Sequence, residues 1–163
     1  MDSFTPTTKT QQALSAAVQA ATAAGNSDVR PAHILVALLD QSDGIAAPLL
    51  KAVGVDPSTV RTLAQAIVDR APTVASASAT PQLSRESIAA VSAAQQLAGE
   101  LNDEYVSTEH LVVGLATGDS DVAKLLHNQG ATPQALREAF VSVRRSEERR
   151  VGQECRSRWA PHH

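Results

Sequence analysis

The sequence predicts an all-α fold of eight helices, arranged as two related four-helix repeats. One observation is a duplicated stretch: residues 29–38, Val-Arg-Pro-Ala-His-Ile-Leu-Val-Ala-Leu, return 77 positions later at 106–115 as Val-Ser-Thr-Glu-His-Leu-Val-Val-Gly-Leu. A second is the abundance of alanine, the residue with the highest helix propensity. A third is that apolar residues recur at helical spacing, with no competing strand pattern. A repeat of this length sets the architecture of the chain.

The similarity between the two copies extends to both sides of this stretch. Upstream the offset stays at 77 residues, and downstream it falls to 76. The matching positions include Ala13 and Ala90, Ala17 and Ala94, Gly54 and Gly130, and Pro57 and Pro133. We assign repeat one to residues 7–70, a small, polar linker to 71–82, and repeat two to 84–143. One repeat of about 65 residues would bury too little apolar surface alone, so we expect a shared core around a pseudo-twofold axis.

Repeat one should contain four helices. They are expected over residues 6–24, from 31 to the Asp-Gly pair at 43–44, over about 45–53, and from 57 onward. Thr5 is the predicted cap of the first helix, and Asp56 that of the fourth, because a short polar side chain can accept a free backbone N–H. Gly25 and Gly54 should end the first and third helices.

Repeat two should contain the four counterparts. They are expected from residue 85, from 108, over about 120–128 and from 133. Ser84, Ser107 and Thr132 are the predicted caps. Gly130 should end the seventh helix, as Gly54 ends the third.

Charge is distributed unevenly along the chain. Residues 1–143 carry 8 Lys and Arg against 14 Asp and Glu, whereas residues 144–163 carry 6 Arg against 3 Glu. The acidic body argues against nucleic acid as a partner. The tail over 146–163 matches neither repeat, so the domain should occupy residues 1–145, and we expect the tail to be disordered or an artefact of sequence assembly. We find no membrane span, no signal peptide and one cysteine, Cys155, which together predict a cytoplasmic location.

The sequence shows no catalytic or metal-binding pattern. No glycine is followed by lysine, which excludes the phosphate-binding loop G-x-x-x-x-G-K-[ST]. His33 and His110 could suggest catalysis or metal binding. They stand at equivalent positions of the two repeats, each at the head of an apolar run, and this favours a packing role for both. We therefore predict no enzymatic activity, no metal and no cofactor.

The doubled pattern V-x-x-x-H-x-L/V-x-x-L, each copy followed by Leu-Leu-x-x-x-Gly and then proline, resembles the Clp N-terminal domain. This double Clp repeat stands at the front of Clp AAA+ unfoldases, and the resemblance covers residues 4–143. Residues 7–9, 11–14, 48–50 and 82–84 are most similar to the ClpB branch, the ATP-dependent disaggregases, of an actinobacterial type. The resemblance implies a domain that captures unfolded or aggregated polypeptides for a hexameric ATPase ring and a DnaK-type chaperone system.

The resemblance also implies a substrate-binding set of Thr7, Asp103 and Glu109, each matching its position in the ClpB pattern. A physical argument points the same way. Thr7 lies at a helix start, where backbone N–H groups are unpaired, and Glu109 opens the sixth helix beside the loop of Asp103. We expect the three to form a polar rim beside apolar residues such as Leu97 and Leu101.

A second function remains open, that of an adaptor- or degron-docking domain of a ClpC- or ClpA-type protease unfoldase. In the ClpC branch, the stretch that ends at the histidine resembles Gly-Thr-Glu-His in both repeats. Its two glutamates bind phosphoarginine as a pair. Here the second copy carries Glu109, but the first carries Ala32, with Arg30 nearby, which disfavours phosphoarginine binding. A stand-alone stress protein with the same double repeat is a third possibility.

Overall fold

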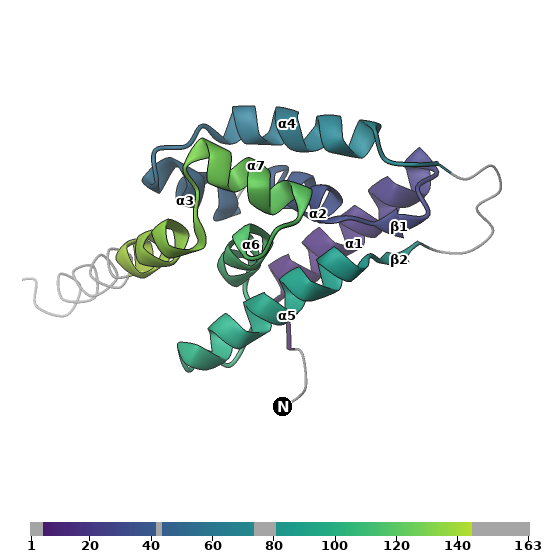
Figure 1. Ribbon diagram of the computed structural model, residues 1–163. Coiled ribbons are helices and arrows are strands. Elements are labelled where there is room, and N and C mark those ends of the chain that lie inside the picture. Colours follow the sequence, from purple (N-terminus) through teal and green to yellow (C-terminus); the bar gives the residue numbers. More distant parts are fainter. Residues whose placement is uncertain (1–4, 42–43, 74–80, 145–163) are drawn as a thin grey trace, which may run out of the picture.

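The computed structural model describes residues 5–41, 44–73 and 81–144 (Figure 1). Within them lie α1 (Thr8–Ala24), α2 (Pro31–Leu39), α3 (Ala46–Ala52), α4 (Pro57–Asp69), α5 (Arg85–Glu100), α6 (Thr108–Ala116) and α7 (Asp121–Gln129). Residues 133–144 form a further helix. The predicted all-α fold is confirmed, and the tail assigned to 146–163 lies outside the described residues. The bounds given to the repeats and the linker stay predictions.

The start of α1 differs from the prediction. Thr7, not Thr5, is its cap, and the Thr7 side chain accepts the backbone N–H of Thr10 at 3.2 Å. Pro6, expected as the first helical residue, instead forms an isolated parallel bridge with Val106. The chain is therefore extended at Pro6, where it pairs with Val106 of repeat two. Helix α1 begins only after this contact, at Thr8.

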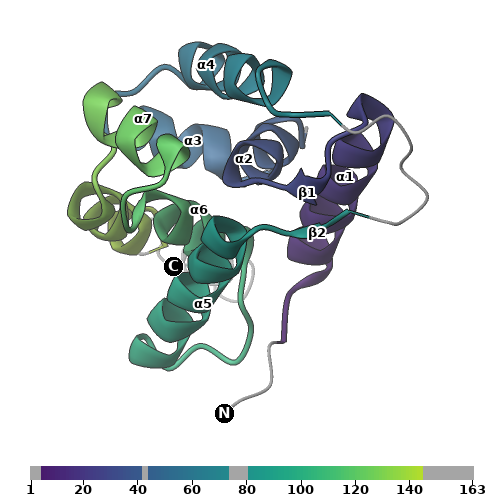
Figure 2. The ribbon, with the colours of Figure 1, turned by 45° about the vertical axis from the view of Figure 1, so that its right-hand side comes forward.

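Two short strands also depart from the predicted pattern. β1 (Asp28–Val29) and β2 (Gln82–Leu83) pair in parallel, on the side of the molecule where α1 ends and α5 begins (Figure 2). Each strand is two residues long, too short to leave the alternation by which strands are recognised. Gln82, which we placed in the linker, is therefore paired with Asp28 of repeat one.

A backbone carbonyl of repeat two binds the start of repeat one. The Val106 carbonyl accepts the backbone N–H of Thr7 at 3.0 Å and the hydroxyl of Thr10 at 2.9 Å. Thr10 is fully buried. The first turn of α1, whose N–H groups have no partner within the helix, is thereby fixed to the segment that leads into α6.

The same arrangement recurs with the repeats exchanged. The Val29 carbonyl accepts the backbone N–H of Ser84 at 2.9 Å and the hydroxyl of Ser87 at 2.7 Å. Val29 and Val106 are 77 positions apart, as are Thr7 and Ser84. We call these two sets of hydrogen bonds the cross-repeat clamps. They make the pseudo-twofold arrangement visible at the level of single hydrogen bonds.

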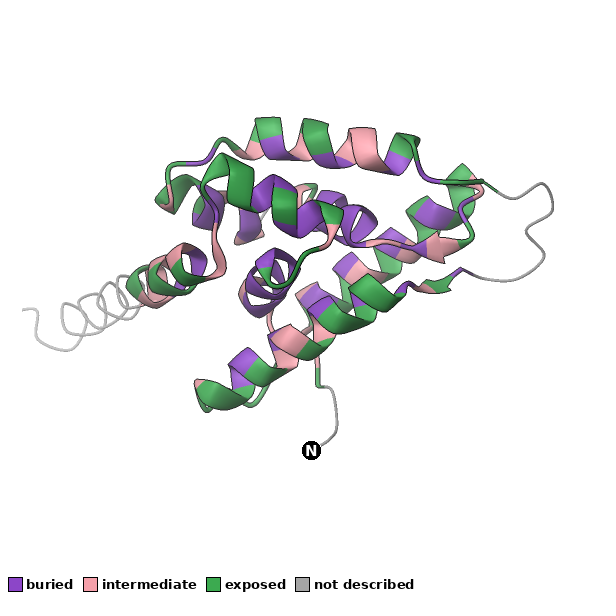
Figure 3. Ribbon diagram, viewed as in Figure 1, coloured by how far each residue is buried: buried purple, intermediate pink, exposed green. Residues whose placement is uncertain are grey.

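The core is built around α2 and α6, which are buried along nearly their whole length (Figure 3). α1 and α4 pack against α2, while α5 and α7 pack against α6. The buried residues of both repeats belong to one cluster. The two repeats therefore share one core, as we expected from the small apolar surface that a single repeat could bury.

α5 and α6 pack tightly against each other at Gly114. A Cβ atom at this position would overlap the carbonyl oxygen of Ala90 and come within 3.0 Å of the backbone nitrogen of Ala94. Repeat one has Ala37 at the equivalent position. The methyl group of Ala37 therefore stands between α1 and α2, whereas Gly114 places no side-chain atom between α5 and α6.

The clamps can be tested by Thr10→Val, which keeps the side-chain shape and removes the hydroxyl donor. We expect the free energy of unfolding to fall by about 1 to 2 kcal/mol, because the buried Val106 carbonyl loses one of two donors. Urea denaturation measures this, with Ser92→Ala on the exposed face of α5 as the control. Equal stability of Thr10→Val and the parent would contradict the clamp's role.

Candidate functional site

The two histidines occupy equivalent buried positions, and each is 1% exposed. In both, Nδ1 accepts the backbone N–H of the residue three positions earlier, at 2.9 Å. Nε2 then carries the proton and donates it at 2.8 Å, from His33 to Asn26 and from His110 to Asp103. Both rings are thus held as structural parts of the helix starts.

Asp103 belongs to a network that repeat one lacks. Arg144 donates two hydrogen bonds to its carboxylate, at 3.0 and 3.2 Å, in addition to the one from His110. The Arg144 guanidinium lies 4.5 Å from the centre of the Phe140 ring, and that ring meets His110 edge-on at 5.3 Å. Burial raises the pKa of the Asp103 carboxyl, but Arg144 and His110 together outweigh it and hold that pKa below its usual value.

The structure brings Thr7, Asp103 and Glu109 together around residues 103–110. Thr7 binds Val106 through its backbone N–H, and Glu109 is half-buried in the first turn of α6. Of the apolar residues expected beside them, Leu97 is only 5% exposed, whereas Leu101 is partly exposed. The carboxylate of Asp103 is already engaged by His110 and Arg144, and the client-binding role of this polar surface stays a prediction.

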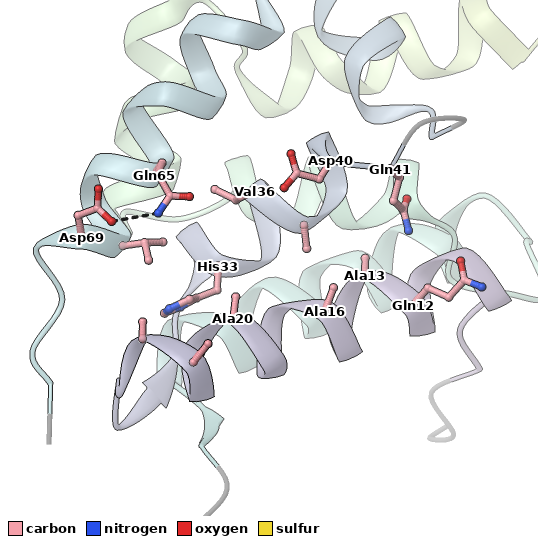
Figure 4. A pocket seen from close by; sticks show the side chains of 14 residues that line it. Gln12, Ala13, Ala16, Ala20, His33, Val36, Asp40, Gln41, Gln65 and Asp69 are labelled. Atoms are coloured by element: carbon pink, nitrogen blue, oxygen red, sulfur yellow. Dashed lines mark hydrogen bonds between the residues drawn. The ribbon is translucent and has the colours of Figure 1, made fainter. Parts of the chain in front are cut away.

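An open groove lies instead in repeat one, between α1, α2 and α4 (Figure 4). Its volume is about 640 Å³. α1 contributes five alanines, of which Ala13 is buried and the other four, among them Ala16, Ala20 and Ala23, are exposed. Val36 and Val68 line it from α2 and α4. Small side chains on one wall and branched ones opposite leave an apolar channel along α1.

The rim of this groove is polar and acidic. Asp40, Gln41, Gln65 and Asp69 stand along it, and none of the lining residues is lysine or arginine (Figure 4). Gln65 donates a hydrogen bond to Asp69 at 3.0 Å. Oε1 of Gln41 is buried and has no hydrogen-bond partner among the described residues. The groove therefore offers hydrogen-bond acceptors at its edges, and none of the residues that line it is a lysine or arginine.

The corresponding face of repeat two holds a smaller pocket of about 260 Å³, whose α5 and α6 walls match those of α1 and α2 but whose third wall is the start of the last helix, at Pro133, Gln134 and Arg137. Larger side chains account for the difference. The pairs, repeat one first, are Ala20 and Leu97, Ala23 and Glu100, Ala64 and Phe140, and Val68 and Arg144. Sequence reasoning missed this site, although aligning the two repeats and comparing side-chain volumes would have revealed it.

Ion pairs reinforce the contrast between the two grooves. In repeat two, Arg137 reaches across to α5 and binds Glu100 at 2.9 Å. In repeat one, Ala23 stands at the position of Glu100, and the equivalent Arg61 binds Asp40 at the end of α2 instead, at 2.6 Å. Among the described residues, no ion pair crosses the repeat-one groove.

Residues 5–129 match the family model of the Clp repeat (R) N-terminal domain. The chain belongs to this family. It is 70% identical over 146 residues, 90% of the chain, to the chaperone protein ClpB of Mycobacterium bovis. This confirms the predicted similarity to the actinobacterial ClpB branch. The chain spans 17% of the length of that curated relative.

Solved structures of Clp N-terminal domains share the fold. The Hsp104 N-terminal domain from Candida albicans is 16% identical, with a TM-score of 0.74, over 88% of this chain and 92% of that one. A complex of the ClpV N-domain with a VipB peptide is 18% identical, with a TM-score of 0.68, over 86% and 92% of the two chains. At these identities the likeness establishes the fold alone.

The described part of the chain does not offer other kinds of site. It holds no group of three or more His, Cys, Asp or Glu side chains arranged to bind a metal ion. Nor does any of its helices combine the length and apolar character needed to cross a membrane. The repeat-one groove is therefore the main candidate site that the described residues present.

The buried state of His33 predicts a pH dependence of stability. Burial lowers the pKa of His33 below its ordinary value of 6.5, although the nearby Asp28 opposes this shift. The unfolded chain therefore takes up the proton first as the pH falls, so the contribution of neutral His33 is complete above pH 6.5 and is lost below it.

We expect the melting temperature to fall between about pH 7.5 and about pH 5.5, and to fall less in His33→Gln. Thermal melts followed by circular dichroism measure this. Asp103 does not interfere, because its lowered pKa places its contribution to stability at more acidic pH. Parallel curves for parent and variant would show that His33 does not cause the dependence.

Proposed function

We propose that this chain is the substrate-binding N-terminal domain of an ATP-dependent protein disaggregase. In this proposal the repeat-one groove captures exposed apolar segments of unfolded or aggregated protein. The observation that carries it is the open, apolar groove of about 640 Å³ in a domain so similar to ClpB.

The shape and chemistry of the groove suit transient binding of many clients. Burying apolar side chains of a client against the alanines of α1 and against Val36 and Val68 yields about 25 cal/mol per Å² of apolar surface. Few directional partners line the floor, so selectivity among apolar sequences should be low. The ClpV N-domain has been seen with a peptide, which supports peptide binding by a domain of this fold.

The activity of the whole protein would lie outside this domain. We propose that the remaining part of the protein forms a hexameric AAA+ ring that hydrolyses ATP and cooperates with a DnaK-type chaperone system in the cytoplasm. The domain itself would perform no catalysis and need no cofactor. Its contribution would be to raise the concentration of clients near the ring by weak, reversible binding.

The polar surface of Thr7, Asp103 and Glu109 is the second candidate for client binding. Its charges would orient a client and raise the association rate more than the affinity. Docking of an adaptor or degron, as in ClpC- or ClpA-type protease unfoldases, is the second candidate function. The 70% identity to ClpB favours the disaggregase over it.

The groove can be tested by Ala20→Leu, which introduces the residue that repeat two carries at Leu97. Leucine favours helix at this exposed position of α1, so the fold should persist while the groove is obstructed. We expect affinity for an unfolded, fluorescently labelled model protein to fall about tenfold, the equivalent of about 1.4 kcal/mol. Fluorescence anisotropy measures binding, and Ala93→Leu in repeat two is the matched control.

The competing surface is tested in the same assay by Thr7→Ala, Asp103→Asn and Glu109→Ala. Asp103→Asn copies Asn26 of repeat one, so it removes the charge and keeps an acceptor for His110. Loss of binding in these three variants, with full binding by Ala20→Leu, would move the client site to the polar surface and contradict the groove.

A further inference from the structure

We infer that a second groove, between α4 and α7, docks a segment of a partner protein that combines aliphatic side chains with aspartate or glutamate. It is distinct from the proposed client groove, because a different flank of α4 lines it. α4 and α7 lie side by side and run in opposite directions (Figure 1). The α4–α7 groove has a volume of about 430 Å³, and its walls include Leu63, Ile67, Arg70, Asp121, Lys124 and Leu125.

α4 carries more apolar surface than the core uses. Its Val60, Ala64 and Val68 are buried in the shared core. Leu63 and Ile67 stand four residues apart, and so lie one above the other on an adjoining face of the helix. Leu63 is 39% exposed and Ile67 is only partly buried, and both line the α4–α7 groove. This apolar strip is left open to solvent by the described chain.

Two cations stand in the same groove without a partner. Arg70 and Lys124 are exposed, and neither side chain forms an ion pair or hydrogen bond with the described residues. Four other arginines each bind a carboxylate within the chain. Over residues 1–143, acidic side chains outnumber basic ones by 14 to 8. Two unpaired cations in one groove are therefore a local departure from the charge of the domain.

The carboxylate of Asp121 does not cancel these charges. It stands in the first turn of α7, where unpaired backbone N–H groups favour a negative charge, and no ion pair joins it to Arg70 or Lys124 among the described residues. Two cations against one carboxylate leave an excess of positive charge. The repeat-one groove on the other flank of α4 is lined by Asp40 and Asp69 and by no lysine or arginine. The two grooves therefore differ in the sign of their charge.

The duplicated fold does not require these side chains. Downstream of the repeated histidine, equivalent positions of the two repeats are 76 residues apart. The counterparts of Leu63 and Lys124 are Ala139 and Pro48. The surface related to this groove by the pseudo-twofold axis thus lacks both the large apolar side chain and the cation, although the same helices form. Leu63 and Lys124 are therefore open to a role in binding.

The layout of the groove defines the occupant. Because the helices run in opposite directions, Arg70 at the end of α4 shares one end of the groove with Lys124, near the start of α7. Leu63 lies toward the other end, about 10 Å from Arg70 along the helix. An amphipathic helix of about three turns, with leucines at one end and glutamates at the other end of the same face, fits this layout. Apolar burial supplies affinity, and the charges fix the orientation.

The test uses a synthetic helical peptide that presents two leucines and, two turns further along the same face, two glutamates. Three further peptides replace both glutamates by glutamine, both glutamates by lysine, or both leucines by serine. Binding to the full chain is measured by NMR shift titration. Relative to the glutamate peptide, we expect affinity to fall about fivefold with glutamine, about twentyfold with lysine and about tenfold with serine. Shift changes should cluster on α4 and α7.

A pair of charge variants locates the acidic preference. Replacing both cations, Arg70→Gln with Lys124→Gln, should make the glutamate and glutamine peptides bind equally. The matched control is Lys51→Gln with Arg85→Gln, which removes two exposed cations outside the groove and should leave the preference intact.

The apolar strip has its own matched pair. Leu63→Ser should weaken binding of the glutamate peptide about tenfold. Ile88→Ser changes an aliphatic side chain of α5 that is 53% exposed and lies outside the groove, and it should leave binding unchanged. Circular dichroism confirms that all variants are folded.

The outcomes separate this inference from the proposed function. Ala20→Leu, which obstructs the repeat-one groove, should not affect the glutamate peptide. Weaker peptide binding in that variant, equal binding of the glutamate, glutamine and lysine peptides, or no binding at all would overturn the inference and leave client capture standing. Self-association of the chain in sedimentation, lost in Leu63→Ser, would assign the groove to a second copy and overturn it too. Full client binding by Ala20→Leu contradicts only the proposed function.

Discussion

The fold depends on two buried carbonyl groups that each serve the opposite repeat. Val106 holds the first turn of α1 through Thr7 and Thr10, and Val29 holds the first turn of α5 in the same way. Neither repeat has enough large apolar side chains to form a stable core alone. Because each clamp satisfies groups that would otherwise be buried without partners, association of the repeats and formation of the helix starts are coupled.

Within this symmetric frame, side-chain size decides which surface is open. The clamps and the buried histidines place the helices of both repeats in equivalent positions. Repeat two then fills its groove with Leu97, Phe140 and Arg144 and bridges it with an ion pair. Repeat one leaves the space empty, because alanines stand along α1. The duplication thus gives one repeat a stabilising role and leaves the other free to bind a ligand.

The same comparison explains why the predicted polar residues and the groove are in different places. Thr7 caps the start of α1 with its side chain, and Asp103, in the loop between α5 and α6, accepts a hydrogen bond from His110. Their side chains are partly committed to the fold, while Glu109 is half-buried beside them. The client capture that we propose would need exposed apolar surface, and the exposed alanines of α1 provide such a surface.

The sequence by itself determined the helical class, the doubled unit, most of the helix starts and the structural role of the histidines. These follow from local chemistry: helical spacing, polar caps, and the repeat of Val29 and His33 at Val106 and His110. Only the tertiary structure decided that Thr7 caps α1, that two-residue strands join the repeats, and that one groove stays open. Each of these depends on segments that are distant in the sequence and meet only in the fold, either across the repeats, as Pro6 and Val106 do, or within one repeat, as Arg137 and Glu100 do. Whether a small residue leaves a cavity is settled by what packs opposite it, and local sequence does not contain that information.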